Sequence, residues 1–204
     1  MTPETHTTER SLYPRQLGLR ENRAVQLRPM GVEDAGRLHA FFLTIPEEDL
    51  LFLRRNVTDP AVIESWALDV AGGHTFTLLA EHEGRVVGEA SIHRSRVPWT
   101  AHVGEIRVVV EAEHRRLGLG SALVDTIFLE ALARGIEKIV AEMTPDQKAA
   151  INVFQKLGFR VEGLLQGHVR DRQGKTRDLL VMAHEVGEGR DQLNRWGITE
   201  AVQG

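Results

Sequence analysis

The stretch HRRLGLGSAL, residues 114–123, lies between a β-branched run over residues 106–110 and a segment with the apolar periodicity of a helix. A strand, a glycine turn and a helix start bring several backbone N–H groups together at the positive end of a helix dipole. Gly118 and Gly120 let the main chain approach a ligand where a Cβ would collide. The stretch therefore predicts a phosphate cradle, and a pyrophosphate is the group that suits it.

The pattern inside this stretch is Arg-x-x-Gly-x-Gly, beginning at Arg115. It lacks the lysine followed by Ser or Thr of a P-loop, and it lacks the third glycine of a dinucleotide fingerprint. It resembles instead the acyl-coenzyme A signature of the GNAT superfamily of N-acetyltransferases, (Gln/Arg)-x-x-Gly-x-(Gly/Ala). Taken alone, glycines at a helix entrance are also explained by a structural cap.

A second stretch decides between these interpretations. Residues 149–159, AAINVFQKLGF, resemble the family's second signature, a helix that ends in Lys-Leu-Gly-Phe. Gly158 reads as a helix-stop glycine, and Phe159 as the start of a strand that returns to the core. Between the two signatures the sequence predicts a helix over residues 118–134, a stop at Gly135 and a strand over residues 138–142. On both signatures, in this order, the chain is identified as a member of the GNAT superfamily.

Length and composition agree with one globular domain. The 204 residues are 42% hydrophobic and 26% charged, which are ordinary globular values. We expect a disordered tail over residues 1–11, a single GNAT-like domain over residues 12–186 and a C-terminal extension over residues 187–204. No apolar run approaches a membrane span and the N-terminus lacks the features of a signal peptide, so a cytoplasmic protein is expected.

Composition also excludes several kinds of chemistry. With no cysteine, the chain has no disulfide, no thiolate metal site and no cysteine acyl intermediate, so acyl transfer is expected to be direct. No pair among the nine histidines has the spacing of a zinc site, and we predict no metal. The net charge of −4 argues against nucleic-acid binding and mildly favours cationic acceptors.

The predicted fold is α+β. Its GNAT-like, mixed but mostly antiparallel sheet has about six to seven strands, is flanked by about four helices, and splays between the strands that precede the two signature helices. A hairpin is expected over residues 17–28 with its turn at 21–23, and helices are expected to about Leu43 and from Pro60 to about Val70. The other predicted strands cover residues 75–81, 85–94, 102–110, 159–168 and 176–184.

The resemblance implies acetyl-CoA as the cosubstrate. In the family, the two strands splay apart and the pantetheine arm lies between them. Applied here, the backbone groups of Val108 and Val110 hold the thioester end, and the amides from Arg116 to Ala122 hold the pyrophosphate. The predicted cosubstrate-binding residues are Val108, Val110, Arg115, Arg116, Leu117, Gly118, Leu119, Gly120, Ser121, Ala122, Gln147, Asn152 and Phe154.

A general base is required because an acceptor ammonium must lose a proton before it attacks the thioester. Glu105 is the leading candidate, since it begins the strand that holds the thioester and resembles acidic residues that some family members use there. Its side chain alternates with those of Val108 and Val110 unless a bulge resets the register, and an exposed strand glutamate is the alternative interpretation. His93, His102 and His168 are weaker candidates.

The sequence departs from the family pattern at Phe154, where many members have a tyrosine that serves as general acid. Phenylalanine cannot return a proton to the leaving thiolate, so water or another residue would assist. Tyr13 is the only tyrosine in the chain. The family's asparagine on this helix is Gln147 in an ungapped alignment, and Asn152 lies further along. Glu142, beside the splay, matches a commonly structural acidic residue.

Three functions remain open. The first is transfer of an acetyl group from acetyl-CoA directly to a primary amine of a small molecule or of a protein lysine or N-terminus. The second, motivated by Phe154, is a noncatalytic acyl-CoA-binding sensor or regulatory module. The third is an interaction protein that kept the fold and lost cosubstrate binding. The acidic segment over residues 45–50 either faces a cationic acceptor or is a solvated loop. Neither a membrane nor a nucleic-acid partner is expected, and a homodimer is consistent with the resemblance.

Overall fold

The computed structural model describes residues 13–50, 53, 55–171 and 173–186. The predicted tail over residues 1–11 and the extension over 187–204 lie outside these residues. The strands are β1 (Arg15–Gly18), β2 (Ala24–Pro29), β3 (Thr75–His82), β4 (Arg85–Arg94), β5 (Val103–Val110), β6 (Lys138–Met143), β7 (Arg160–Arg170) and β8 (Thr176–Glu185). The α-helices are α1 (Ala35–Phe42), α2 (Pro60–Ala71), α3 (Leu119–Ala133) and α4 (Lys148–Lys156).

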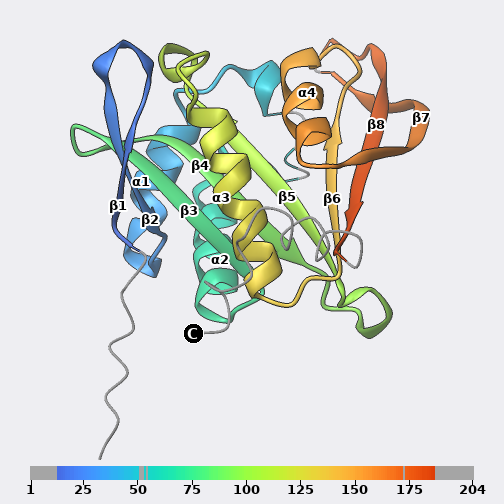
Figure 1. Ribbon diagram of the computed structural model, residues 1–204, viewed down its shortest axis with the longest axis horizontal. Coiled ribbons are helices and arrows are strands. Elements are labelled where there is room, and N and C mark those ends of the chain that lie inside the picture. The colour runs from blue at the N-terminus through green and yellow to red at the C-terminus, as the bar shows by residue number, and fades with distance from the viewer. Residues whose placement is uncertain (1–12, 51–52, 54, 172, 187–204) are drawn as a thin grey trace, which may run out of the picture.

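These strands form one eight-stranded sheet in the order β1-β2-β3-β4-β5-β6-β8-β7 (Figure 1). Neighbouring strands are antiparallel except β5 and β6, which are parallel. The α+β fold with a mostly antiparallel sheet is therefore confirmed, with one strand more than the six to seven predicted. The short edge strand β1, which pairs with β2 across the turn at residues 20–22, brings the number to eight.

Local sequence signals set where the helices begin and end. The Asp59 side chain accepts a 2.9 Å hydrogen bond from the Ala61 amide, and Pro60 lies in the first turn of α2. Gly135 follows α3 with φ of 71°, and Gly158 follows α4 with φ of 83°. Glycine suits both positions because it adopts left-handed backbone conformations without strain. The helix boundaries predicted at these positions are confirmed.

The helices cover the two faces of the sheet in pairs. Helices α1 and α2 lie on one face, and α3 and α4 lie on the other (Figure 1). The α3/α4 face buries an apolar cluster that includes Ile127 and Phe154, whereas the α1/α2 face buries a separate cluster around Phe42 and Trp66. Burial of these two layers supplies the main driving force for folding. No helix in the described part of the chain is long and apolar enough to cross a membrane.

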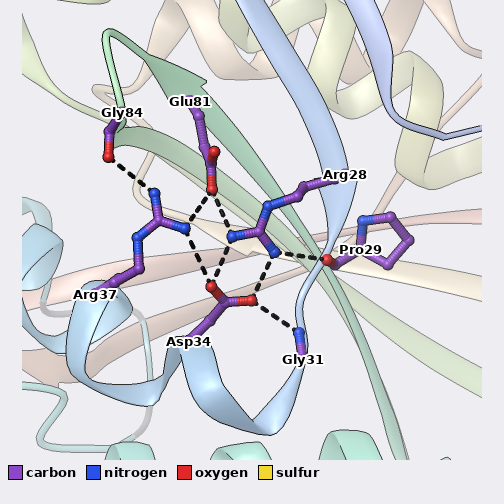
Figure 2. A network of polar contacts seen from close by, with 7 residues as sticks. All are labelled: Arg28, Pro29, Gly31, Asp34, Arg37, Glu81 and Gly84. Carbon is purple, nitrogen blue, oxygen red and sulfur yellow. Dashed lines mark hydrogen bonds and ion pairs between the residues drawn. The ribbon is translucent and has the colours of Figure 1, made fainter.

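A polar network fastens α1 to the sheet (Figure 2). Arg28 on β2 holds both carboxylate oxygens of the buried Asp34 at 2.6 Å and also contacts Glu81 on β3 at 2.6 Å. Arg37 on α1 contacts the same two carboxylates, and the Gly31 amide donates to Asp34 at 2.9 Å. Arg28 is the main cause that lowers the pKa of Asp34 to about 2. The network fixes the start of α1 against β2 and β3.

The parallel pair at the centre of the sheet is short. Residues 103–105 of β5 pair with residues 138–140 of β6, and the last pair is Glu105 with Val140. Beyond it β5 continues to pair with β4 and β6 continues to pair with β8, but not with each other. The predicted splay between the strands that precede α3 and α4 is therefore confirmed.

Candidate active site

The splay opens into a cavity with a volume of about 600 Å³. It is bounded by β5 and β6, by the start of α3 and by one face of α4. The predicted site residues that line it are Glu105, Val108, Val110, Arg115, Arg116, Gly118, Gly120, Ser121, Gln147 and Phe154. Asp49, from the acidic segment over residues 45–50, also lines the cavity. Further lining residues, which the sequence did not single out for the site, include Leu53, Arg107, Val124, Ala149, Ala150 and Val153.

The start of α3 presents main-chain donors to this cavity. Gly118 precedes the helix with φ of 99°, and no side chain caps it. The amides of residues 116–121 donate to no acceptor among the described residues, and the first helical hydrogen bond is that of the Ala122 amide to the Gly118 carbonyl. A Cβ on Gly120 would meet nothing nearer than Val110 Cγ2 at 3.9 Å, so a larger side chain there has space to enter the cavity. These features fit the pyrophosphate of coenzyme A.

Four predicted binding residues do not line the cavity. Leu119 is fully buried, and Leu117 is buried with its carbonyl accepting from the Arg20 amide. Their own amides remain in the cradle, but the Ala122 amide does not, because the helix already uses it. Asn152 is exposed on α4, whose residues 149, 150, 153 and 154 face the cavity. The 3.6-residue period of the helix places position 152 on the opposite side.

The two arginines of the cradle differ in their contacts. Arg115 donates from Nε to the Val110 carbonyl at 2.9 Å and from Nη2 to Asp49 at 2.6 Å. Its side chain thus ties the cradle to β5 and to the connection between α1 and α2. Arg116 is exposed and has a positive φ of 61°. The acidic segment over residues 45–50 therefore contacts the cradle through Asp49.

Strand β5 uses alternate residues for different purposes. Glu111, the residue after β5, donates from its amide to the Val87 carbonyl of β4, so hydrogen-bonded pairs between these strands fall at odd-numbered residues of β5. The main-chain groups of Val108 and Val110 consequently point away from β4, toward the splay. Their side chains pack into the α3/α4 cluster. Plain core packing and a binding role for the backbone are therefore compatible in these two valines.

The odd-numbered side chains of β5 point to the α1/α2 face. The ladder with β4 has no register shift, so Glu105 shares this face with Arg107 and Val109. Arg107 donates from Nε to Glu105 Oε1 at 2.8 Å and from Nη1 to the Leu53 carbonyl at 2.7 Å. Glu105 also occupies the last residue pair before the strands separate. The i, i+2 spacing was the signal in the sequence that could have identified Arg107.

The histidines considered as bases lie outside the cavity. His93 is directly opposite Glu105 in the ladder, with Nε2 at 3.0 Å from Ser91 Oγ and Nδ1 at 3.4 Å from Thr75 Oγ1. Burial, together with the charges of two arginines, lowers the pKa of His93 to about 3. The ring is therefore neutral, and both of its nitrogens have hydrogen-bond partners. His102 and His168 are exposed and do not line the cavity.

The structure also shows where the residues that depart from the family pattern lie relative to the cavity. Phe154 is buried, lines the cavity and packs edge-on against Phe159 with ring centroids 4.9 Å apart. Tyr13, the only tyrosine, donates to Glu130 on α3 at 2.8 Å and does not line the cavity. Gln147 lies at the cavity wall where α4 begins, and Glu142 on β6 also lines it.

Known proteins share this architecture. Residues 40–159 match the model of the acetyltransferase (GNAT) family. The chain is 28% identical over 152 residues to phosphinothricin N-acetyltransferase of Streptomyces viridochromogenes, covering 72% of this chain and 80% of that protein. It is 25% identical over 162 residues to the L-methionine sulfoximine/L-methionine sulfone acetyltransferase of Pseudomonas aeruginosa, covering 78% and 93%. The structure of a phosphinothricin acetyltransferase from Sinorhizobium meliloti in complex with AcCoA aligns with a TM-score of 0.68 and 19% identity, covering 79% and 88%.

The match to the family model spans more than half of the chain and includes both signatures. Acetyl-CoA as cosubstrate and an acyltransferase activity, both predicted from the signatures, are confirmed, and the readings without an enzymatic activity are set aside. From the motifs, the splayed sheet and the family match together, the chain belongs to the GNAT family of acetyltransferases.

Proposed function

We propose that the protein transfers the acetyl group of acetyl-CoA directly to the primary amine of a small amino acid, with Glu105 as the general base. The observation that carries this proposal is the position of Glu105, which lines the cavity at the residue pair where β5 and β6 separate. The main-chain groups of Val108 lie further along the same strand, on the splayed edge. A thioester held by the main-chain groups of Val108 would therefore lie in the same cavity as Glu105.

Glu105 and the main chain of β5 have different roles in the proposed reaction. Glu105 accepts a proton from the acceptor ammonium, either directly or through one water. The uncharged nitrogen forms a bond to the acetyl carbon, the carbon–sulfur bond breaks, and its electron pair leaves with the thiolate. A main-chain N–H on the splayed edge of β5 stabilises the negative charge that develops on the carbonyl oxygen. The second proton of the nitrogen finally reaches the thiolate.

Proton return to the thiolate does not depend on a tyrosine here. Phe154 occupies the position where many family members carry that residue, and Tyr13 lies away from the cavity. A thiolate is a fairly good leaving group near its own pKa, so water can supply the proton. We therefore assign no general acid among the side chains.

The acceptor class rests on the relatives and on the cavity. The two curated relatives carry names of acetyltransferases for phosphinothricin and for L-methionine derivatives. Glu105, Arg107 and Leu53 line the cavity together, and Glu105 and Arg107 place a carboxylate beside a guanidinium there. A small acceptor that carries both an amine and an acid fits this lining better than a simple amine does.

Substituting Glu105 with glutamine tests the proposal. The carboxamide keeps the size of the side chain but cannot accept the proton, so kcat/KM at neutral pH should fall by roughly 10²- to 10⁴-fold. The loss should shrink at higher pH, where more of the amine is already uncharged. Thiol release with a panel of amino acids, measured from pH 6 to 10, reports both effects.

Glu137→Gln is the matched control, because Glu137 is exposed and does not line the cavity. It should leave the pH profile unchanged. If Glu105→Gln retained the wild-type rate and pH profile, Glu105 would not be the base. Acetyl-CoA binding, followed by calorimetry in each variant, shows whether the cosubstrate site is intact.

A further inference from the structure

Arg107 is a buried charge on the acceptor side of the cavity. Its side chain is 10% exposed, and that of Glu105 is 19% exposed. The Nε hydrogen bond to Glu105 and the Nη1 hydrogen bond to the Leu53 carbonyl hold the guanidinium from two directions. The group is therefore fixed in orientation before any acceptor arrives.

The guanidinium of Arg107 has N–H donors beyond those used in its two hydrogen bonds. It carries five N–H groups, and the two hydrogen bonds use one on Nε and one on Nη1. Nη2 has no acceptor among the described residues, and Arg107 lines the cavity. A carboxylate matches the Nη1–Nη2 edge of a guanidinium with two parallel hydrogen bonds. The N–H groups of Arg107 that remain for a carboxylate are the two on Nη2 and the second one on Nη1.

The neighbouring titratable groups leave the charge of Arg107 available. Glu89 on β4 lies on the same face of the sheet and is fully buried. Burial raises its pKa to about 8, although Arg107 and the nearby Ser91 favour the carboxylate. Neither carboxyl oxygen of Glu89 makes a hydrogen bond of ordinary geometry. At neutral pH Glu89 and His93 are thus mostly uncharged, and the ion pair of Arg107 is with Glu105.

We propose that Arg107 is a specificity-determining residue that binds the carboxylate of the acceptor while Glu105 receives its ammonium group. This inference rests on the proposed function and adds to it the residue that selects an α-amino acid. The two side chains lie two residues apart on one strand face and contact each other at 2.8 Å. An α-amino acid carries its ammonium and its carboxylate group on the same carbon atom. The ammonium group can therefore pair with Glu105 while the carboxylate pairs with Arg107.

Other amines satisfy the pair less well. A monoamine occupies Glu105 but leaves the donors of Arg107 buried and unpaired, which is costly. A diamine adds repulsion between its second ammonium and the guanidinium. The bonds made and broken are the same for every amine, so once kcat/KM is corrected for the fraction of each amine that is uncharged, the remaining difference reports binding of the acceptor in its reactive position.

The wild-type protein provides the first test. Leucine, methionine and phenylalanine are each compared with their amides and with the amines that lack the carboxyl group, and kcat/KM is measured by thiol release. Each amino acid should exceed its amine by on the order of 10²- to 10³-fold. The amino group of an amino-acid amide is less basic than that of the amino acid, so a larger fraction of it is uncharged at neutral pH. This difference alone would favour the amide, so it cannot produce the expected preference for the amino acid over the amide.

Variants of Arg107 provide the second test. In Arg107→Gln the ratio between amino acid and amine should fall to near one, because kcat/KM for the amino acid should fall by far more than kcat/KM for the amine. Arg107→Lys keeps the charge but loses the paired donors, and its ratio should be intermediate. Arg134→Gln serves as the control, because Arg134 pairs with Glu130 at the far end of α3 and does not line the cavity. Its ratio should match the wild type.

The outcomes separate the two proposals. If the wild type acetylates amines and amino acids equally well, or if Arg107→Gln lowers both equally, Arg107 does not read the carboxylate and the acetyltransferase assignment still stands. If the wild type binds acetyl-CoA but acetylates no member of the panel, the proposed acceptor class fails and this inference fails with it. Calorimetric binding of acetyl-CoA shows that each variant is folded, and if Arg107→Gln does not fold, Arg107→Lys and the wild-type comparison decide.

Discussion

The absence of a side chain at Gly120 should be what lets the start of α3 hold a pyrophosphate. Gly120 lies in the first turn of α3 beside the cavity, with space next to Val110. Gly120→Val should place a branched side chain over the free amides and weaken acetyl-CoA binding by at least roughly 100-fold. The core should remain folded, because the nearest atom to a Cβ is 3.9 Å away.

Gly36→Val is the matched control for this change. Gly36 is the second residue of α1 as Gly120 is of α3, and a Cβ there meets nothing within 4 Å. It should leave the dissociation constant unchanged in a calorimetric titration with acetyl-CoA. Equal affinity in Gly120→Val and the wild type would show that the pyrophosphate binds elsewhere.

Single residues also show where prediction from sequence ends. Glu105 is predicted because it begins the strand expected to hold the thioester and resembles acidic residues that some family members use there. Arg107 shares its strand face, but the contact that fixes it comes from Leu53, 54 residues away in the sequence. No local pattern encodes that contact, because it depends on how the connection between α1 and α2 folds against β5.

At the scale of elements, Asp34 fastens α1 to two strands. Its pKa of about 2, mainly due to Arg28, lies below its ordinary value of 3.8, so the folded state favours the charged form. This contribution to stability is fully present above pH 3.8 and is lost as the pH falls through about 2. Asp34→Asn should lower the free energy of unfolding by roughly 2 to 3 kcal/mol at pH 7.

The pH dependence identifies the charge as the cause. Urea denaturation of the wild type and Asp34→Asn should differ by the same amount at pH 7 and pH 5. The difference should narrow below pH 4, as the wild-type carboxylate becomes protonated. A difference that stayed constant down to pH 2.5 would mean that the lost hydrogen-bond geometry, rather than the charge, accounts for the effect.

Elements differ in how well the sequence predicts them. The ends of α2, α3 and α4 follow from Pro60, Gly135 and Gly158, because capping is decided within a few residues. The hairpin expected over residues 17–28 is present, but its first strand, β1, lies at Arg15–Gly18, because the pairing with β2 rather than a local pattern sets where it begins. The contact of Asp49 with Arg115 spans 66 residues and likewise has no local signature.

For the whole molecule, two groups on β4 make opposing contributions to how stability depends on pH. The folded state keeps Glu89 protonated up to about pH 8, whereas its ordinary pKa is 4.5, so stability falls as pH rises between these values. The pKa of His93 is lowered from 6.5 to about 3, so this group makes stability rise with pH over that interval. The two effects oppose each other between pH 4.5 and 6.5, and above pH 6.5 only that of Glu89 remains.

The free energy of unfolding should therefore decline between pH 6.5 and 8, by up to about 1 kcal/mol per pH unit. In Glu89→Gln, which is neutral at every pH, this decline should be absent. Chemical denaturation at pH 6.5, 7.25 and 8 measures it, with Glu137→Gln as an exposed control. Parallel declines in Glu89→Gln and the wild type would assign the effect to other groups.

Strand β5 presents main-chain groups to the splay and side chains to the face that α1 and α2 cover. Toward the splay it offers the main chain of its even-numbered residues, which every amino acid supplies alike. Toward α1 and α2 it offers the side chains of Glu105 and Arg107, which a single substitution replaces. On the proposed roles, substitution of Arg107 should change the choice of acceptor while the main-chain groups that face the splay stay as they are. The alternation of side chains along one strand would then separate acceptor selection from cosubstrate binding.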